Sequence, residues 1–309
     1  MSSLARAEAI LRAACGDRLR TAFPMAPLTT FRIGGPAALY LEPESEADLE
    51  AAAQALVASG LPHVVIGKGS NVLVSDRGFD GLVLRLGRAY RWAARDGDRL
   101  AAGGSMPLPA LAGVALRHGL AGFEFGVAIP ATLGGSVKMN AGAHGGEIAD
   151  VVVGIEVFRL AEGITEHVPA AGAGFSYRRS ALPSDAVVTA ATAELGEGSA
   201  DAIRAAMDEA RAWRKRTQPL AEPNCGSVFK NPAGDHAAAL IEGSGLKGTR
   251  VGAAQVSTKH ANFIVTGERA RAEDVKALID LVRREVESHA GVTLEPEVQM
   301  IGSFDRVTR

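Results

Sequence analysis

A serine in an uncommon setting is the first residue of this chain that could do chemistry. Residues 224 to 232 read Asn-Cys-Gly-Ser-Val-Phe-Lys-Asn-Pro, which places Ser227 between a glycine and an apolar pair. The nucleophile of a serine hydrolase usually stands in a G-x-S-x-G elbow, where an acid and a histidine activate it. The pattern Cys-Gly-Ser-Val-Phe lacks the last glycine of that elbow, so it does not predict a serine hydrolase.

A short glycine-bearing loop at residues 67–71, Gly-Lys-Gly-Ser-Asn, could hold a phosphate group. It is not a Walker loop, because Pro62 stands where the earlier glycine belongs, and it is not a dinucleotide fingerprint, because Val72 stands where the third glycine belongs. Successive glycine amides, with the Ser70 hydroxyl and the Asn71 amide, can still form an anion-binding nest. A tight turn without a ligand is an equally good interpretation of this loop alone.

A second stretch, residues 126–146, has six glycines and only one charged residue, Lys138. A loop this long inside a compact domain is usually functional. Glycine amides can come close to a pyrophosphate because no Cβ stands in the way. A plain surface loop would carry more charge, so this stretch favours cofactor binding.

The composition narrows the class of ligand. The 309 residues are 47% hydrophobic and 22% charged, with a net charge of -2. This length predicts about two domains of ~150 residues. A nearly neutral chain with no long run of one sign lacks the electrostatic footprint of a protein that binds nucleic acid or an anionic membrane. We therefore expect a small-molecule substrate. Composition does not determine the oligomeric state, for which a monomer is favoured.

Cysteine usage and the N-terminal sequence indicate the compartment. Cys15 and Cys225 lie far apart without a C-x-x-C motif, so neither a disulfide framework nor a cysteine zinc site is predicted, and we expect no metal. Arginines interrupt the apolar stretches of residues 1–20, so no signal peptide is predicted, and no window is long enough to span a bilayer. A cytoplasmic protein is expected, with Cys225 as a small packing residue.

Apolar periodicity predicts the elements that must position these residues. The first part predicts a helix to Ala14 and a β-α-β unit over 37–67, whose helix starts at Ser45. It then predicts strands within 82–103, a helix over 107–120, strands over 150–160 and 186–195, and a helix over 200–216.

Residues 217–224 contain two prolines and are the best linker candidate. Beyond them we expect a strand over 226–230, a helix over 236–245, a strand over 262–266 and a helix over 271–289. The last helix should bury Val275, Leu278, Ile279, Val282 and Val286 along one stripe. This mixed order predicts an α+β protein rather than one doubly wound sheet.

Several motifs together resemble one enzyme family. In order along the chain they are TTFRIGGPA, GKGSNVLVSD, GLAGFEF, IPATLGGSVKMNAGAHGGEIAD, FSYRRS, CGSVFKNP, SGLKGTRVGAAQVSTKHANFIV and LEPEVQMIG. The chain resembles the UDP-N-acetylenolpyruvoylglucosamine reductases (the MurB family) from about residue 20 to residue 302. The resemblance implies an FAD-binding fold of the vanillyl-alcohol-oxidase type and a smaller α/β substrate-binding domain. It also implies that NADPH is used, through FAD, to reduce the enolpyruvyl ether to UDP-N-acetylmuramate for peptidoglycan.

The same resemblance implies a division of the chain. Residues 1–80 and 81–198 would form two FAD-binding subdomains and residues 199–309 the substrate-binding domain, whose last strand returns to the FAD-binding part. The short stretch between Ser180 and Gly226 leaves no room for the extra tyrosine loop of one subclass. The chain therefore resembles the shorter subclass.

The resemblance also assigns catalytic roles. Hydride addition to the terminal enolpyruvyl carbon leaves carbanion character beside the carboxylate, which demands a proton donor and stabilisation of the enolate oxygens. The matching motifs assign the proton to Ser227, the enolate oxygens to Arg178 and the acidic partner to Glu297, with Glu295 as a fallback. Arg179 should face away from Arg178 if this segment is extended.

The remaining site residues follow from the two loops and the matching motifs. We expect FAD contacts at Gly67, Lys68, Gly69, Ser70, Asn71, Ile129, Pro130, Ala131, Thr132, Gly134, Gly135, Ser136, Asn140 and Ile148. Substrate contacts are expected at Tyr177, Lys230 and Asn231, although a surface lysine is an equally good interpretation of Lys230. For His260 a hydrogen-bonded structural role is favoured.

Two rival functions stay open at this point. A flavin oxidase or dehydrogenase with another substrate would share the FAD loops but would not need Ser227, Arg178 and Glu297 together. A non-catalytic nucleotide-binding module would need neither these residues nor a reducible flavin. The presence of all three residue types in their motifs favours the reductase.

Overall fold

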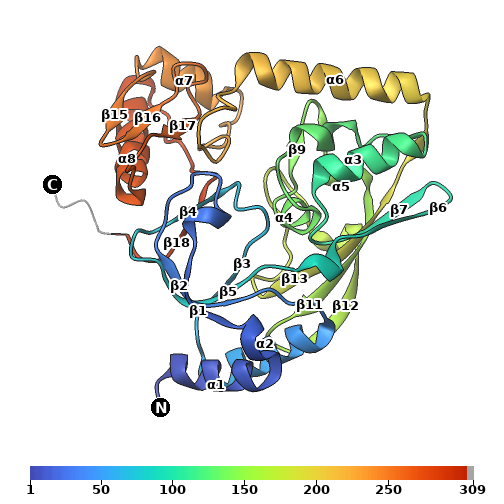
Figure 1. Cartoon of the computed structure of the whole chain (residues 1–309). Coiled ribbons are helices and arrows are strands. Elements are labelled where there is room, and N and C mark those ends of the chain that lie inside the picture. The colour runs from blue at the N-terminus through green and yellow to red at the C-terminus, as the bar shows by residue number, and fades with distance from the viewer. Residues whose placement is uncertain (305–309) are drawn as a thin grey trace. The chain divides into compact units, whose positions relative to one another are not determined.

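The computed structural model describes residues 1–304, and its contacts divide the chain into two compact units. The first unit contains residues 1–21, 39–68 and 81–213, and the second contains residues 22–38, 69–80 and 214 onward. Figure 1 labels the elements along the chain. The α+β class is confirmed, because helices and mainly antiparallel strands alternate without one doubly wound sheet.

A five-stranded antiparallel sheet forms the centre of the first unit. Its order is β12-β11-β13-β7-β6, where the strands are β6 (Ala93–Asp96), β7 (Arg99–Gly103), β11 (Val152–Arg159), β12 (Ile164–Pro169) and β13 (Ala186–Glu194). Helices α3 (Leu108–Arg117), α4 (Leu133–Lys138) and α6 (Ala200–Thr217) add side chains to the same core. This packing holds the second glycine stretch against the sheet.

Two helices make a separate core in the first unit. They are α1 (Ser3–Cys15) and α2 (Glu46–Ser59), and they bury leucines and alanines with Leu82 and Leu84. The predicted start of α2 is confirmed, since the Ser45 side chain accepts a hydrogen bond from the Asp48 N–H.

The predicted β-α-β unit has an extra strand between its two strands. A four-stranded sheet has the order β1-β2-β5-β3, with β1 (Arg20–Pro24), β2 (Pro36–Leu41), β3 (His63–Val65) and β5 (Phe79–Leu84). Strand β5 therefore lies between β2 and β3, and it pairs with β3 in parallel. The local pattern predicted the strands but not this insertion.

The second unit is built on helix α8 (Ala272–Ala290). The five apolar residues predicted for its stripe are all buried, so this helix and its face are confirmed. It packs with α7 (Ala237–Gly243) and the antiparallel strands β15 (Arg250–Val251), β16 (Ala254–Val256) and β17 (Ile264–Thr266). A parallel pair joins β4 (Val72–Val74) to the last strand, β18 (Gln299–Ile301).

Short elements complete the chain. They are β8 (Leu120–Ala121), β9 (Gly142–Ala143), β10 (Gly146–Glu147), α5 (Ile148–Val151), β14 (Gly196–Glu197) and five 3-10 turns at Gly16–Arg18, Ala26–Leu28, Arg88–Tyr90, Glu124–Ala128 and Ala170–Ala173. Within residues 1–304, no helix has both the length and the apolar character needed to cross a membrane.

Two expectations about local structure are wrong. Residues 226–230 do not form a strand, because only Phe229 makes a bridge, to Pro296. The stretch 126–146 is not one loop, since it contains helix α4 and the strand pair β9–β10. At Phe229 a contact distant in sequence decides the backbone conformation, whereas α4 and the β9–β10 pair form through bonds that are local in sequence.

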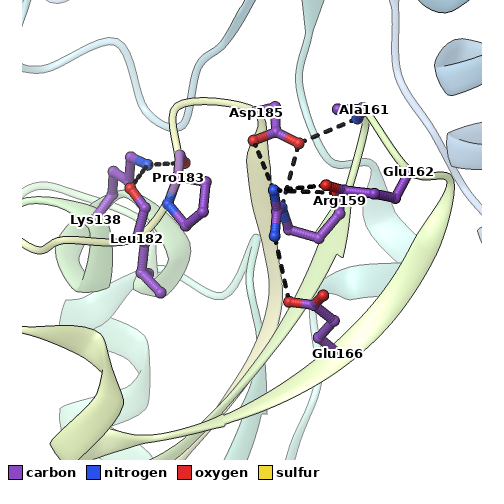
Figure 2. A network of polar contacts seen from close by, with 8 residues as sticks. All are labelled: Lys138, Arg159, Ala161, Glu162, Glu166, Leu182, Pro183 and Asp185. Atoms are coloured by element: carbon purple, nitrogen blue, oxygen red, sulfur yellow. Dashed lines mark hydrogen bonds and ion pairs between the residues drawn. The ribbon is translucent and has the colours of Figure 1, made fainter.

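A charged cluster ties strand β11 to the segment before β13 in the first unit. Figure 2 shows the Arg159 guanidinium between Asp185, Glu162 and Glu166, with Nε 3.3 Å from an Asp185 oxygen. Asp185 also accepts the N–H of Ala161 at 3.1 Å. Burial opposes ionisation of Asp185, but these partners outweigh it and lower the pKa of Asp185 below its ordinary value.

We expect Asp185→Asn to lower the free energy of unfolding of the apoprotein by about 1–3 kcal/mol at pH 7, because it removes a mostly buried charged acceptor. Since the folded-state pKa is lower than the unfolded value of about 3.9, this contribution is present above that value and is lost as pH falls through the folded-state pKa. Denaturant unfolding should therefore show the difference from wild type shrinking below about pH 4.

The matched control for that measurement is Asp201→Asn, because Asp201 pairs with Arg204 on an exposed helix face. This control should unfold like wild type both at pH 7 and below about pH 4. A difference for Asp185→Asn that stays constant down to about pH 2 would contradict the lowered pKa.

Candidate functional site

The two glycine-bearing loops predicted from the sequence touch each other in the first unit. A Cβ built on Gly67 would lie 2.4 Å from the Thr132 Oγ1, so no other residue fits at position 67 without a shift. The Thr132 hydroxyl caps helix α4 by accepting the Gly135 N–H at 3.4 Å. The two loops thus converge at the start of α4.

The loop 67–71, in which the chain passes from the first unit into the second, presents its amides to no protein acceptor. None of its five backbone N–H groups donates to another residue among those described. Gly69 has a φ of +68°, and its carbonyl accepts the Thr30 N–H at 3.0 Å. Five successive unbonded amides beside the exposed Lys68 have the chemistry of a phosphate-binding nest.

The start of helix α4 uses its amides differently. The N–H groups of Leu133 and Gly134 donate to the carbonyls of Met106 and Gly104 at 2.8 and 2.9 Å. A Cβ on Gly134 would lie 3.0 Å from the Val188 carbonyl oxygen, so this glycine allows α4 to pack closely on strand β13. The expectation that the amides of this stretch meet a pyrophosphate is therefore not supported at Leu133 and Gly134.

Ser136 offers a polar group that the protein itself does not use. Its side chain is completely buried in α4, and its Oγ has no hydrogen-bond partner among the described residues. A buried hydroxyl without a partner costs free energy, so such a group in a native protein requires an explanation. A bound FAD that supplies a hydrogen-bond partner for the Ser136 hydroxyl is one explanation. In this respect the residues of α4 fit the cofactor.

The other predicted cofactor residues fall into two kinds. Ile129, Pro130 and Ala131 are at least partly exposed, and Ala131 does not have a positive φ, so it causes no backbone strain. Ile148 and Asn140 are completely buried. The Asn140 side chain is bonded to Glu147, Ser176 and Ala149, so these bonds shape the loop.

Arg178 lies in a tight turn, so the expected extended segment is wrong. Ser176 and Arg179 exchange backbone hydrogen bonds of 2.9 and 3.0 Å, which leaves Tyr177 and Arg178 at the tip. Arg178 has a φ of +57°, its Nη2 donates to the Gly142 carbonyl at 3.0 Å, and its guanidinium lies 5.0 Å from the Tyr177 ring centre. The strand alternation used to exclude Arg179 does not apply in a turn.

In the second unit, Ser227 and Glu297 come from neighbouring segments. The Glu297 N–H donates to the carbonyl of Val228, the residue after Ser227, at 2.8 Å. Both Ser227 and Glu297 are half-buried. Leu294 and Val298, which lie before and after Glu297 in the chain, are buried.

Sequence reasoning missed the residue that holds this arrangement. Asn262 is buried, its Oδ1 accepts the Phe229 N–H at 2.9 Å, and its Nδ2 donates to the Phe229 carbonyl at 2.8 Å. Its own carbonyl accepts the Val228 N–H. The only sequence signal for this role was an asparagine just before the apolar residues of β17. From the sequence, a role was predicted only for the neighbouring His260.

Lys230 and Asn231 both have protein partners. The Lys230 Nζ lies 2.6 Å from Glu295 Oε1, which makes Glu295 the partner of this lysine. The Asn231 Oδ1 accepts the N–H of Ala237, the first residue of α7. A ligand at Lys230 would have to share or replace its carboxylate partner.

His260 and Cys225 have environments that suit structural roles. The Nδ1 of His260 accepts the Asn262 N–H at 3.3 Å, and burial is the main cause that lowers the pKa of His260, so the ring is neutral. Burial, and then the charge of Glu297, raise the pKa of the Cys225 thiol far above its ordinary value, which disfavours a nucleophilic thiolate. Over residues 1–304, no three His, Cys, Asp or Glu side chains are grouped so that they could hold a metal ion.

Comparison with known proteins identifies the class first. A family model described as an FAD binding domain matches residues 37–168, which include both glycine loops. A second model, described as the C-terminal domain of UDP-N-acetylenolpyruvoylglucosamine reductase, matches residues 218–301. The two matches and the loop geometry define an FAD-dependent oxidoreductase.

Relatives then give the particular family. The chain is 46% identical over 281 residues to the UDP-N-acetylenolpyruvoylglucosamine reductase of Heliobacterium modesticaldum, covering 90% of this chain and 89% of that one. It is 44% identical to the enzyme of the same name from Anaeromyxobacter sp. strain Fw109-5, covering 97% and 93%. The crystal structure of the Thermus caldophilus reductase matches with a TM-score of 0.81 at 37% identity, covering 92% of this chain and 99% of that chain. The chain belongs to the UDP-N-acetylenolpyruvoylglucosamine reductase family.

Gly67→Ala should weaken FAD binding at least ~10-fold, equivalent to about 1.4 kcal/mol, because the new Cβ would push Thr132 away from its capping position. Flavin absorbance retained after gel filtration measures this. Gly196→Ala is the control, since a Cβ there meets nothing within 4 Å. Full retention of FAD by the Gly67→Ala protein would show that this contact is not needed.

Ser136→Ala should lower FAD affinity about 5-fold, the usual contribution of one hydrogen bond, without destabilising the apoprotein. The stability of the apoprotein should even rise slightly, because a buried hydroxyl without a partner is removed. FAD titration and denaturant unfolding of the apoprotein measure the two effects. A marked loss of apoprotein stability would mean that the hydroxyl has a partner in the protein.

Proposed function

We propose that this chain reduces UDP-N-acetylglucosamine enolpyruvate to UDP-N-acetylmuramate with NADPH and FAD, a step of peptidoglycan precursor synthesis. The observation that carries the proposal is the match to reductases of this name along nearly the whole chain, with identities of 44–46%. The convergence of the two glycine loops at Thr132 supports the cofactor part independently.

FAD would be held mainly by the loop 67–71 and the start of helix α4. The unbonded amides of that loop would meet the pyrophosphate, and the Ser136 hydroxyl would meet another polar atom of the cofactor. When bound, FAD supplies the transfer of a hydride from NADPH to the terminal enolpyruvyl carbon.

Ser227 would give the proton that completes the reduction. The carbon next to the substrate carboxylate becomes strongly basic, so a neutral hydroxyl is acidic enough and no catalytic triad is needed. The bonds of Asn262 to Val228 and Phe229 fix the backbone that carries Ser227. Glu297, held to Val228 from the adjacent segment, would be the acidic partner near the reacting carbon.

Arg178 would stabilise the negative charge that grows on the enolate oxygens. A guanidinium can donate two parallel hydrogen bonds to a carboxylate, which suits this intermediate. Tyr177 and Asn231 are proposed to contact the substrate. Lys230 would exchange its Glu295 partner for the diphosphate of the UDP group.

A cytoplasmic monomer of the shorter subclass is part of the same proposal. Precursors that carry UDP are used in the cytoplasm, and the family acts on a small UDP-sugar. A flavin oxidase with another substrate is the remaining rival, and it predicts no reaction of the reduced enzyme with the enolpyruvyl compound.

Anaerobic half-reactions test the proposal. NADPH should bleach the flavin of wild type and of Ser227→Ala at similar rates, because no proton from Ser227 is needed in that half. Added enolpyruvyl substrate should restore the colour of wild type rapidly and that of Ser227→Ala about 10²–10⁴-fold more slowly, the usual contribution of a proton donor. Stopped-flow absorbance measures both steps.

The matched control is Ser244→Ala, because Ser244 only donates to the Leu240 carbonyl in helix α7. It should behave like wild type in both halves. A protein that purifies without flavin and binds none would contradict the flavoenzyme. Bleaching without recolouring in wild type would support the flavoenzyme but show that its substrate is another compound. Recolouring of Ser227→Ala at the wild-type rate would show that Ser227 is not the proton donor.

A further inference from the structure

The turn that carries Arg178 is bonded at several points to the segment that ends helix α4, within the first unit. The Asn140 Nδ2 donates to the Ser176 carbonyl at 3.0 Å, and the Ser180 Oγ donates to the Lys138 carbonyl at 2.9 Å. Arg178 itself donates to Gly142. These bonds hold both sides of the turn against residues 138–142.

Among these bonds, those of the Lys138 side chain join the residues that are furthest apart in sequence. Its Nζ donates to the Leu182 carbonyl at 2.8 Å and to the Pro183 carbonyl, as Figure 2 shows, and Leu182 lies 44 residues further along the chain. No carboxylate lies within ion-pair distance of this ammonium among the described residues. Burial lowers the pKa of Lys138, although the more distant charge of Asp185 acts in the opposite direction.

An ammonium that is partly buried without a carboxylate partner is costly, so its position requires a reason. A lysine at the end of a helix commonly satisfies the last carbonyls of its own helix. Lys138 instead reaches a separate segment, whose far end is held by Arg159 through Asp185. The segment after Arg178 is thus fixed at residues 180, 182–183 and 185.

The backbone of Arg178 also requires such support. A non-glycine residue in the left-handed region costs of order 1–3 kcal/mol and persists only where the surroundings over-determine it. At a φ of +57°, Arg178 is in that region, and the bonds on both sides of the turn supply the constraint. Loosening one of them would widen the range of positions open to the guanidinium.

We infer that Lys138 is a positioning residue, which fixes the Arg178 turn relative to helix α4 through the carbonyls of Leu182 and Pro183. This inference rests on the proposed function of Arg178. Helix α4 begins at the predicted cofactor loop and ends at Lys138, so one short rigid element would set both the cofactor contact at Ser136 and the place of the arginine.

Lys138→Met in the FAD-loaded enzyme tests this role. FAD content and the rate of bleaching by NADPH should stay within about 2-fold of wild type, whereas recolouring by substrate should slow about 30–100-fold, because a misplacement near 1 Å can cost 10²-fold. KM for the substrate should change less than kcat. Lys138→Arg should recover most of the rate, since a guanidinium can also donate to two carbonyls.

Hydrogen exchange of the apoprotein gives a readout that does not need activity. Lys138→Met should speed amide exchange in peptides covering residues 176–183 at least about 10-fold, and exchange elsewhere should stay unchanged. Lys276→Met is the matched control, because Lys276 pairs with Asp280 on helix α8 and is outside this network.

The outcomes separate this inference from the proposed function. If wild type fails to recolour, the proposed function fails, and the exchange data still decide whether Lys138 fixes the turn. Unchanged exchange in 176–183, or equal slowing of both half-reactions by Lys138→Met, would overturn the positioning role. If Lys138→Met does not fold, exchange and recolouring of Lys138→Arg decide, and a Lys138→Arg enzyme as slow as Arg178→Met would also overturn it.

Discussion

The close approach of Gly67 to Thr132 is the contact on which the proposed cofactor site depends. A Cβ at position 67 would collide with the hydroxyl that caps helix α4, so the absence of a side chain lets the first glycine loop lie against the second. The amides of 67–71 have no protein acceptor among the described residues, and helix α4 of the first unit contains a buried hydroxyl that also has no partner among them. Polar groups left open in this way are what a dinucleotide cofactor would satisfy.

The two glycine loops have similar compositions but different physical roles. In the first loop, glycine frees successive amides and allows the positive φ of Gly69. In the second, Gly134 removes a side chain between helix α4 and strand β13, while the amides of Leu133 and Gly134 are already used by carbonyls of the protein. A glycine-rich stretch therefore indicates close approach, and only the structure shows whether the neighbour is a ligand or the protein's own backbone.

In each unit a polar side chain that is at least partly buried holds a segment next to a proposed catalytic residue. Asn262 uses its side chain and carbonyl to hold the residues after Ser227, and Lys138 uses an ammonium to hold the segment after Arg178. Each makes bonds to backbone groups at least 33 residues away in sequence. The bonds of Asn262 are costly to lose because the Phe229 groups would remain buried, which makes such bonds suited to fixing a backbone segment.

The sequence by itself determined the family, the α+β class and the helices with strong apolar periodicity. The stripe of α8 and the capped start of α2 follow from local rules, because helix burial and N-capping act over three to seven residues. Eight motifs in order also sufficed to identify the family, because several specific motifs in one order rarely occur together by chance. The tertiary structure alone decided the backbone at Phe229, the turn at Arg178, the insertion of β5 between β2 and β3, and the bonds that Asn262 and Lys138 make. The turn at Arg178 is closed locally by Ser176 and Arg179, but it is held from residues 138–142. In the other cases the physical reason is that the deciding hydrogen bonds join residues far apart in the chain, and no local periodicity records them.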